Sequence, residues 1–297
     1  MKEKTLIILM GSARGGKHAM LTQEKYFIDH LDADLALCLG DIDEIDDFLI
    51  NKAKYNWNFK DFENWREYFE EHFSKNIFEN LSFGKDSYLM GGIDSYNGSG
   101  AIIFAIRDIL LRNHIDVIES YSQVILTRSD YIYVNYHQNL DKENIWALEG
   151  EDYFGITDRH YVFPGKDSRK ILGICNYLDK KNIYKDWSKP LTPEVVLMFY
   201  FKDIGIFEKI KRFKRTQMSV KKSSDSTTTR EGFKLFLFND LYAKKIGEFE
   251  NAMKQLNFFD NPTNLNLRLK INFYLFQLLK MINTLTFKIL KKRFFTQ

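Results

Sequence analysis

Cysteine is almost absent from this chain, with Cys38 and Cys175 the only two in 297 residues. Two isolated cysteines give neither the spacing of a zinc site nor a disulfide framework, which indicates a protein of a reducing compartment. A signal peptide is not expected either, because the apolar run near the N-terminus ends at Gly11 and is too short for the hydrophobic segment of such a peptide. We therefore expect a cytoplasmic protein.

A strong overall charge is also lacking. The 43 Lys and Arg residues and 40 Asp and Glu residues leave a formal net charge of +3, and no RNA- or DNA-binding module is visible. These two absences argue against a nucleic-acid partner. Hydrophobic residues at 44% and charged residues at 28% are typical of a soluble globular protein with a sizeable core, in one large domain or two small ones.

A strand, a glycine-rich turn and a helix are predicted at the N-terminus. The apolar run of residues 5–10 indicates a buried parallel strand, and Gly11-Ser12-Ala13-Arg14-Gly15-Gly16-Lys17-His18 follows it. This octapeptide matches the phosphate loop G-x-x-x-x-G-K-[ST] except at His18. Gly11 and Arg14 are candidates for contact with a nucleotide diphosphate. A P-loop kinase or sulfotransferase-like enzyme, or a turn without any ligand, remains an alternative.

A second strand at Ala33–Gly40 is followed by Asp41-Ile42-Asp43, the D-x-D pattern with which many sugar-nucleotide transferases bind a divalent ion. More acids follow at once, so a solvated loop is the competing interpretation.

The next region has aromatic residues at helical spacing, which we interpret as core rather than as a sugar platform. Those residues are Phe62, Trp65, Phe69 and Phe73.

A glycine-rich loop at 91–100 precedes a predicted helix at 101–113, for which Ser99 is a plausible N-cap.

The stretch around which the chain is organised comes next. An apolar run, Val124–Leu126, meets the polar triplet Arg128-Ser129-Asp130, and an alternating aromatic run follows. This pattern predicts a buried strand that delivers a cation and a carboxylate to the carboxyl edge of a sheet, where α/β proteins bind ligands. A structural ion pair is the alternative.

A later acidic loop contains the best candidate for a general base. Asp158 is followed by Arg159 and His160, and a sugar hydroxyl that attacks an anomeric carbon needs a carboxylate to take its proton. Glu151 and Asp152 are competitors, and a helix N-cap or a loop salt bridge is the structural alternative for Asp158.

The basic run at 209–215 is a candidate to stabilise a departing diphosphate, through Lys211, Arg212 and Arg215, if it folds over the donor. A solvated basic face is the alternative.

Residues 223–230 are rich in Ser and Thr and fit a mobile loop or a linker, and Gly232–Phe259 reads as helical apart from Gly247.

The C-terminal segment 265–295 contains no acid, and polar residues interrupt its apolar run. A transmembrane span is disfavoured for that reason. A basic amphipathic helix on an anionic membrane surface, at the inner face of the membrane, and a helix packed on the protein or on a partner subunit both fit.

Three features occur together in this order: the N-terminal strand with its Gly/Arg turn, the strand that runs into Thr127-Arg128-Ser129-Asp130-Tyr131, and Gly-x-x-Asp-Arg at 155–159. Over residues 5–215 the chain thereby resembles the GT-A-type glycosyltransferases of bacterial and viral polysaccharide assembly, in the neighbourhood of the WavE-like lipopolysaccharide synthesis proteins. The resemblance implies a nucleotide-sugar donor and a glycan or lipid-linked acceptor. Arg14 would help to hold the nucleotide, Arg128 and Asp130 would occupy the D-x-D position, and Asp158 would face the acceptor.

Arg128-Ser129-Asp130 departs from the D-x-D pattern of that family, because one carboxylate stands where two are usual. Asp130 is then a candidate ligand of Mn²⁺ or Mg²⁺ or a contact of the donor sugar, and Arg128 offers direct neutralisation of phosphate instead. We expect a GT-A-like, Rossmann-like α/β catalytic domain at 1–222, with a mostly parallel sheet flanked by helices. Residues 223–297 are expected to form a helical extension. A non-enzymatic scaffold at the membrane is a further alternative.

Overall fold

The computed structural model describes residues 2–12, 15–40, 47–83, 88–180, 191–222, 235–238, 241–255 and 264–290. Arg14, the Asp41-Ile42-Asp43 pattern and the Ser/Thr-rich segment 223–230 lie outside the described residues. The predictions made for them therefore stay predictions.

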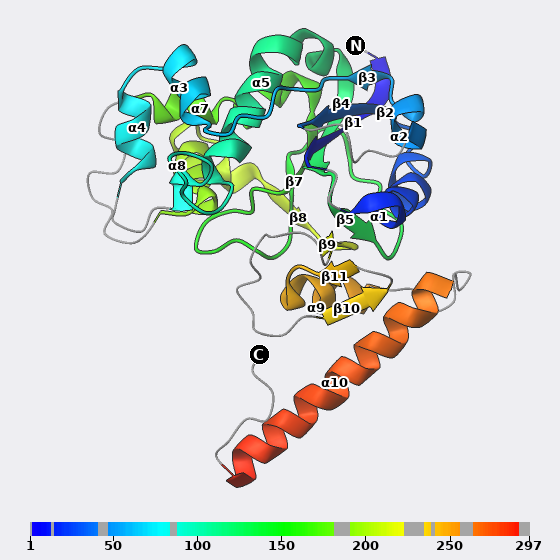
Figure 1. Cartoon of the computed structure of the whole chain (residues 1–297). Helices are drawn as coiled ribbons and strands as arrows, with labels where there is room; N and C mark the ends of the chain where they lie inside the picture. Colours follow the sequence, from blue (N-terminus) through cyan, green and yellow to red (C-terminus); the bar gives the residue numbers. More distant parts are fainter. Residues whose placement is uncertain are drawn as a thin grey trace.

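The molecule is an α/β protein built on a seven-stranded sheet with the order β3-β2-β1-β4-β7-β6-β8 (Figure 1). Strands β2 and β4 pair in parallel with β1, and β3 continues the parallel half beyond β2. Only β7 runs against the others, since it is antiparallel to both β4 and β6, while β8 pairs in parallel with β6. The strands of this sheet are β1 (Lys2–Gly11), β2 (Asp34–Leu39), β3 (Tyr55–Asn56), β4 (Tyr121–Arg128), β6 (Trp146–Leu148), β7 (His160–Pro164) and β8 (Lys211–Phe213).

Helices cover both faces of this sheet, which explains why its central strands read as continuous apolar runs. Leu6 and Ile8 of β1 pack into the larger core with α3 to α8, whereas Ile7 and Leu9 pack on the other face with α1 and α2. The helices are α1 (Gly16–Gln23), which continues as a π-helical turn (Glu24–Ile28), α2 (Asp47–Lys52), α3 (Arg66–His72), α4 (Asn76–Leu81), α5 (Gly100–Glu119), α6 (Ser168–Leu172), α7 (Ile174–Leu178) and α8 (Pro193–Asp203). Short 3₁₀ turns lie at Tyr88–Met90, Gly165–Asp167 and Phe207–Lys209.

A second, four-stranded sheet lies beside the main one, with the order β10-β11-β9-β5. All of its neighbouring strands are antiparallel. Its strands are β5 (Tyr131–Tyr133), β9 (Gln217–Lys222), β10 (Leu235–Phe238) and β11 (Leu241–Ala243), followed by α9 (Ile246–Lys254) and α10 (Asn264–Leu290). Strand β9 ends where the predicted first domain ends, and its neighbour β11 belongs to the predicted extension, so the chain on both sides of residue 222 shares one sheet.

The aromatic stripe is confirmed as core, because Trp65 and Phe69 are buried. One sequence prediction is wrong. The interval 232–259 contains β10 and β11 before its helix, because Leu235–Phe238 and Leu241–Ala243 pair as a hairpin that extends β9. Ser99 is confirmed as the N-cap residue of α5, although its side chain makes no capping hydrogen bond.

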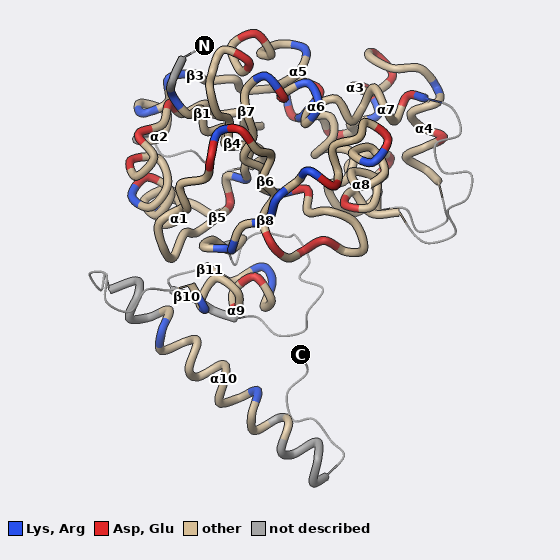
Figure 2. The backbone as a smooth tube through the Cα atoms, turned by 180° about the vertical axis from the view of Figure 1, so that it is seen from behind, with Lys and Arg blue, Asp and Glu red and all other residues tan. Residues whose placement is uncertain are grey.

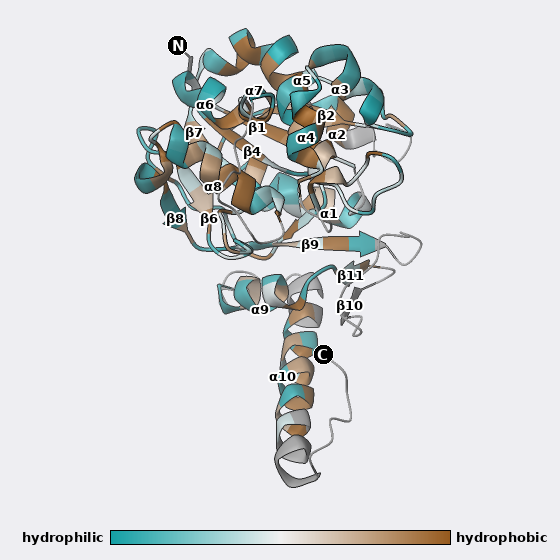
Figure 3. Cartoon of the chain, turned by 90° about the vertical axis from the view of Figure 1, so that its left-hand side faces the viewer, coloured by the Kyte–Doolittle hydropathy of each residue, from teal (hydrophilic) through white to brown (hydrophobic). Residues whose placement is uncertain are grey.

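Helix α10 extends well beyond the body of the molecule, and its main contacts with that body are at α9 and β10 (Figures 1 and 3). Phe273 and Phe276 on α10 face Phe249 of α9, with ring centroids 6.0 and 6.2 Å away. Within the described part of the chain, no helix combines the length and the apolar character needed to cross a bilayer.

Candidate functional site at the carboxyl edge of the sheet

The carboxyl ends of β1 and β4 lie side by side, because Met10 of β1 is in register with Arg128 of β4. The backbone N–H of Ser129 donates to Met10 O at 3.1 Å, and Ser129 Oγ donates to Ser12 O at 2.7 Å. The order β3-β2-β1-β4 makes this pair of strands the point at which the sheet changes winding direction, where open α/β sheets bind their ligands. Gly11 turns the chain there with φ of 102°, a value that favours glycine.

Gly15, at the end of the glycine-rich turn, lies against this edge. A Cβ on Gly15 would lie in ordinary contact with Asp130 Cα, at 3.7 Å, but only 2.3 Å from Ala19 Cβ, so the contact with α1 requires glycine. The first turn of α1, which carries Lys17 and His18, exposes both of those side chains. Gly15 and Asp130 therefore lie side by side at the carboxyl edge.

Arg128 and Asp130 form a two-pronged ion pair. Arg128 Nε donates to Asp130 Oδ1 at 2.7 Å and Arg128 Nη2 donates to Oδ2 at 2.6 Å, while Lys244 Nζ lies 3.7 Å from Oδ2. Burial alone would raise the pKa of the Asp130 carboxyl, but Arg128 and Lys244 hold that pKa well below its usual value. Asp130 therefore stays ionised. A guanidinium has five N–H donors, so Arg128 keeps donors beyond the two that Asp130 occupies.

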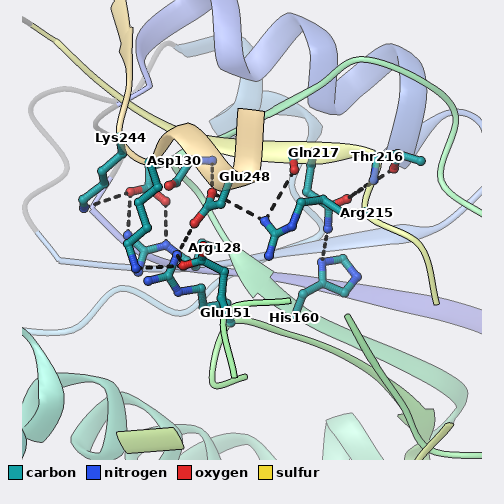
Figure 4. A network of polar contacts seen from close by, with 12 residues as sticks. Arg128, Asp130, Glu151, His160, Arg215, Thr216, Gln217, Lys244 and Glu248 are labelled. Atoms are coloured by element: carbon teal, nitrogen blue, oxygen red, sulfur yellow. Dashed lines mark hydrogen bonds and ion pairs between the residues drawn. The ribbon is translucent and has the colours of Figure 1, made fainter. Parts of the chain in front are cut away.

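A cluster of buried charges lies beside this pair (Figure 4), and the charge of Arg159 acts on both Arg128 and Asp130. Arg159 contacts three carboxylates: Glu248, which accepts a hydrogen bond from Nη1, Glu151 at 3.1 Å and Asp158 at 3.5 Å. Arg215 Nη1 lies 3.4 Å from Glu248, on the other side of that carboxylate. The structure thus brings Arg128, Asp130, Asp158 and Arg215 into one neighbourhood, with Arg159 and Glu248 as the connecting residues.

Glu248 of α9 is the most deeply buried member of this network. Its side chain has 0% exposure, and its Oε2 accepts the backbone N–H of Ser219 at 2.6 Å. Burial alone would raise the pKa of Glu248, but Arg159, Arg215 and that N–H lower it to about 2. A charge buried among two arginines fixes the position of α9 against β7 and β9.

Asp158 precedes β7 and is buried, at 4% exposure. Its Oδ1 accepts no hydrogen bond in the structure, and its backbone oxygen accepts Nη2 of the fully buried Arg107 at 2.8 Å. Burial and the neighbouring Asp158 charge together raise the pKa of Glu194, near the start of α8, to about 7. An acceptor oxygen without a hydrogen-bond donor, next to a second carboxyl group whose pKa is raised, suits a proton-accepting role.

The loop before Asp158 holds an unusual backbone. Glu151, Tyr153 and Phe154 have φ of 62°, 40° and 70°, in the left-handed region that residues with a side chain rarely adopt. Lys245 Nζ holds this loop by donating to Glu151 at 2.7 Å and to Tyr153 Oη at 2.5 Å. Such conformations persist only where surrounding contacts enforce them, and they cluster at functional sites.

The basic run at 209–215 does not form one surface. Arg215 is buried at 2% exposure and faces Glu248, whereas Arg212 Nη2 pairs with Asp152 at 2.5 Å and Arg212 Nη1 donates to Leu148 O at 3.0 Å. Lys211 lies apart from the charge network, 3.9 Å from Asp141 and above the ring of Trp146. The three cations therefore point to three different partners.

Asp130 does not fit a divalent cation well. Both of its oxygens are bound by Arg128, whereas Mg²⁺ and Mn²⁺ take several oxygen ligands. Among the residues that the structure describes, no three His, Cys, Asp or Glu side chains gather in a metal-binding group. We therefore derive no step through a metal at this carboxylate.

Two histidines are stacked in the core beside the network. His137 Nε2 lies 3.1 Å from His160 Nε2, and His137 Nδ1 lies 2.8 Å from Gln138 O. His160 Nδ1 lies 2.8 Å from Thr127 Oγ1 and 3.2 Å from Gln217 Nε2. One neutral tautomer of each ring satisfies all these contacts, with His160 donating through Nε2 and His137 through Nδ1. Burial lowers the pKa of His137 to about 4 and that of His160 well below its usual value.

Acidification is therefore expected to destabilise the fold. Because the folded-state pKa of His137 lies below the unfolded value of about 6.5, its contribution is complete above pH 6.5 and is lost as the pH falls toward 4. Each buried histidine of this kind lowers the free energy of unfolding by about 1.4 kcal/mol for every pH unit that the pH falls within that interval. Urea unfolding at pH 6.5 and pH 5 should show a smaller loss of unfolding free energy in His137→Gln than in the unchanged protein. Equal losses in the two proteins would show that His137 does not cause the sensitivity to acid.

Sequence reasoning missed Lys244, Lys245, Glu248, Glu194 and Arg107 as members of the site. Glu248 had one usable signal, a lone acid between the apolar residues Ile246 and Phe249. Lys244 and Lys245 gave none, because nothing in the sequence shows that β11 pairs with β9 and thereby returns the chain to Asp130.

Comparison of the sequence with models of known protein families found no match, and comparison with curated proteins found none either. The interpretation of the site therefore rests on its geometry and chemistry.

Proposed function

We propose that this protein is a glycosyltransferase with a GT-A-like catalytic domain. It would move a sugar from a nucleotide-diphosphate donor to a glycan or lipid-linked acceptor in surface polysaccharide biosynthesis. One observation carries the proposal: Gly11 and Gly15, the Arg128–Asp130 pair at the end of β4 and Asp158 before β7 lie at the carboxyl edge of a mostly parallel sheet. The order of motifs that resembles GT-A glycosyltransferases supports the same conclusion.

The donor diphosphate belongs beside Arg128 in this proposal. Arg128 is 20% exposed and has N–H donors beyond those bound to Asp130, and Lys244 adds a second cation at the same carboxylate. Cations aimed at a leaving diphosphate stabilise the charge that develops as the glycosidic bond breaks. The start of α1, at Gly15 and Gly16, supplies backbone N–H groups on the same side.

Asp158 is the proton acceptor in this proposal. The acceptor hydroxyl attacks the anomeric carbon, its proton passes to Asp158 Oδ1, and the bond between that carbon and the diphosphate breaks. Arg107 fixes the backbone of Asp158, and Arg159 Nε lies 3.5 Å from its Oδ1, so the residue is positioned before the acceptor arrives. The strained loop at Glu151–Phe154 lies immediately upstream and belongs to the acceptor side.

Thermal unfolding against a panel of nucleotide sugars tests the proposal, since a ligand that binds only the folded state raises its stability. We expect one nucleoside diphosphate sugar to raise the Tm. At a ligand concentration a hundredfold above Kd, binding should raise the free energy of unfolding by about 2–3 kcal/mol. Because Arg128 and Lys244 face the diphosphate, the shift should persist when Mn²⁺ is replaced by a chelator. A shift with ATP or a sulfated adenosine nucleotide, and none with nucleotide sugars, would favour the P-loop alternative.

A further inference from the structure

Helix α10 has two faces of opposite character. Leu269 and Phe276 are buried against the four-stranded sheet and α9. Lys280 Nζ pairs with Glu250 of α9 at 2.9 Å. The other face carries large apolar side chains that are between 37% and 60% exposed. We call this set the exposed stripe of α10: Ile271, Tyr274, Leu275, Leu278, Met281 and Ile282.

The exposed stripe is continuous along the helix. Its members are spaced by three or four residues, or are adjacent, so they share one side of α10. The stripe spans three turns of helix, and Figure 3 shows this part of α10 standing clear of the body of the molecule. Scattered exposed apolar residues need no explanation, but a contiguous stripe of six marks an interaction surface.

The charge on this segment has one sign. Residues 261–297 contain seven Lys and Arg and no Asp or Glu, and Figure 2 shows only basic residues among the charged positions on the described part of α10. Lys270 lies beside the start of the stripe in the sequence. An apolar stripe accompanied by cations alone is the pattern of a helix that lies in the interface of an anionic bilayer.

We infer that α10 binds the surface of an anionic lipid bilayer, with the exposed stripe inserted among the acyl chains and its cations at the headgroups. The charge of this segment favours lipid over a second copy of the helix as the binding partner. Two copies of α10 would bring cations against cations, because the segment has no acid to pair with them, whereas anionic headgroups complement them. This inference is independent of the proposed sugar transfer.

Cosedimentation of the full-length protein with vesicles tests the inference. The vesicles are phosphatidylcholine alone or an equimolar mixture with phosphatidylglycerol, at low and high salt. We expect binding to the anionic vesicles, weaker binding at high salt because the electrostatic part is screened, and little binding to phosphatidylcholine alone.

Two variants with the same added charge isolate the stripe. Leu278→Glu places a carboxylate within it, and Thr284→Glu places one on an exposed polar position, one turn after Lys280 on the side that faces α9. Because both lose the same electrostatic attraction, their difference reports the lost burial of Leu278. Leu278→Glu should bind about tenfold more weakly than Thr284→Glu.

Equal binding of the two variants, or no binding of the unchanged protein to anionic vesicles, would overturn the inference. Analytical ultracentrifugation without vesicles provides the other decisive result. A dimer that Leu278→Glu converts to a monomer would assign the stripe to self-association instead, whereas a monomer in all three proteins supports the lipid surface. Both positions are exposed, so unfolding curves should match that of the unchanged protein.

Discussion

Asp158→Asn is expected to lower the rate of sugar transfer by about 10²–10⁴-fold, because it removes the only proposed proton acceptor for the attacking hydroxyl. The asparagine has the same shape, and Arg159 keeps Glu248 and Glu151 as partners, so the fold should persist. Donor binding should change little, since Arg128 and Lys244 pair with Asp130 rather than with Asp158. The measurement is the kcat for transfer, with the Kd for the donor determined separately.

Asp152→Asn is the matched control for this prediction. Asp152 lies in the same loop, but its Oδ1 accepts the Thr157 N–H at 2.9 Å and pairs with Arg212, so its oxygen is already engaged. We expect kcat to fall far less than in Asp158→Asn. A larger loss in Asp152→Asn would transfer the role of base to that competitor.

Glu248→Gln is expected to lower the free energy of unfolding by about 3–5 kcal/mol, the cost of leaving buried charges without their partner. The substitution removes the carboxylate shared by Arg159 and Arg215, while Glu151 and Asp158 remain for Arg159 alone. Because the pKa of Glu248 is about 2, the carboxylate is ionised throughout the ordinary pH range. Urea unfolding monitored by circular dichroism measures the loss.

Glu250→Gln on the same helix provides the comparison. Glu250 pairs with Lys280 of α10 at 2.9 Å near the surface, where a single ion pair contributes about 0–1 kcal/mol. A loss in Glu248→Gln no larger than that in Glu250→Gln would show that the buried network does not hold α9 in place.

The central strands and their edge follow from the sequence because their signals are local. The apolar runs before Gly11 and Arg128 predict buried strands, and parallel strands necessarily present their carboxyl ends at one edge. That rule brings Gly11, Arg128 and Asp130 together without knowledge of any contact. The aromatic spacing at Phe62–Phe73 was equally local, and the predicted core assignment is confirmed by the burial of Trp65 and Phe69.

The C-terminal contribution to the site could not be predicted in the same way. The hairpin of β10 and β11 reads as helix because its pairing with β9 is a tertiary contact, which overrides the local preference. Lys244, Lys245 and Glu248 enter the site only through that pairing. The basic run is dispersed for a related reason: neighbouring residues of a strand point to opposite faces, so Lys211 and Arg212 have different partners.

Calorimetric titration of a nucleoside diphosphate sugar into the unchanged protein, Arg128→Ala and Lys211→Ala tests the central claim most directly. If the donor lies at the junction of β1 and β4, the unchanged protein should bind without added metal. Arg128→Ala should bind at least about tenfold more weakly, through the loss of a charged hydrogen bond worth about 1.5–3 kcal/mol. Lys211→Ala, which alters a cation paired with Asp141 outside the network, should bind as the unchanged protein does. Binding that is indifferent to Arg128, or absent for every nucleotide sugar, would contradict the account.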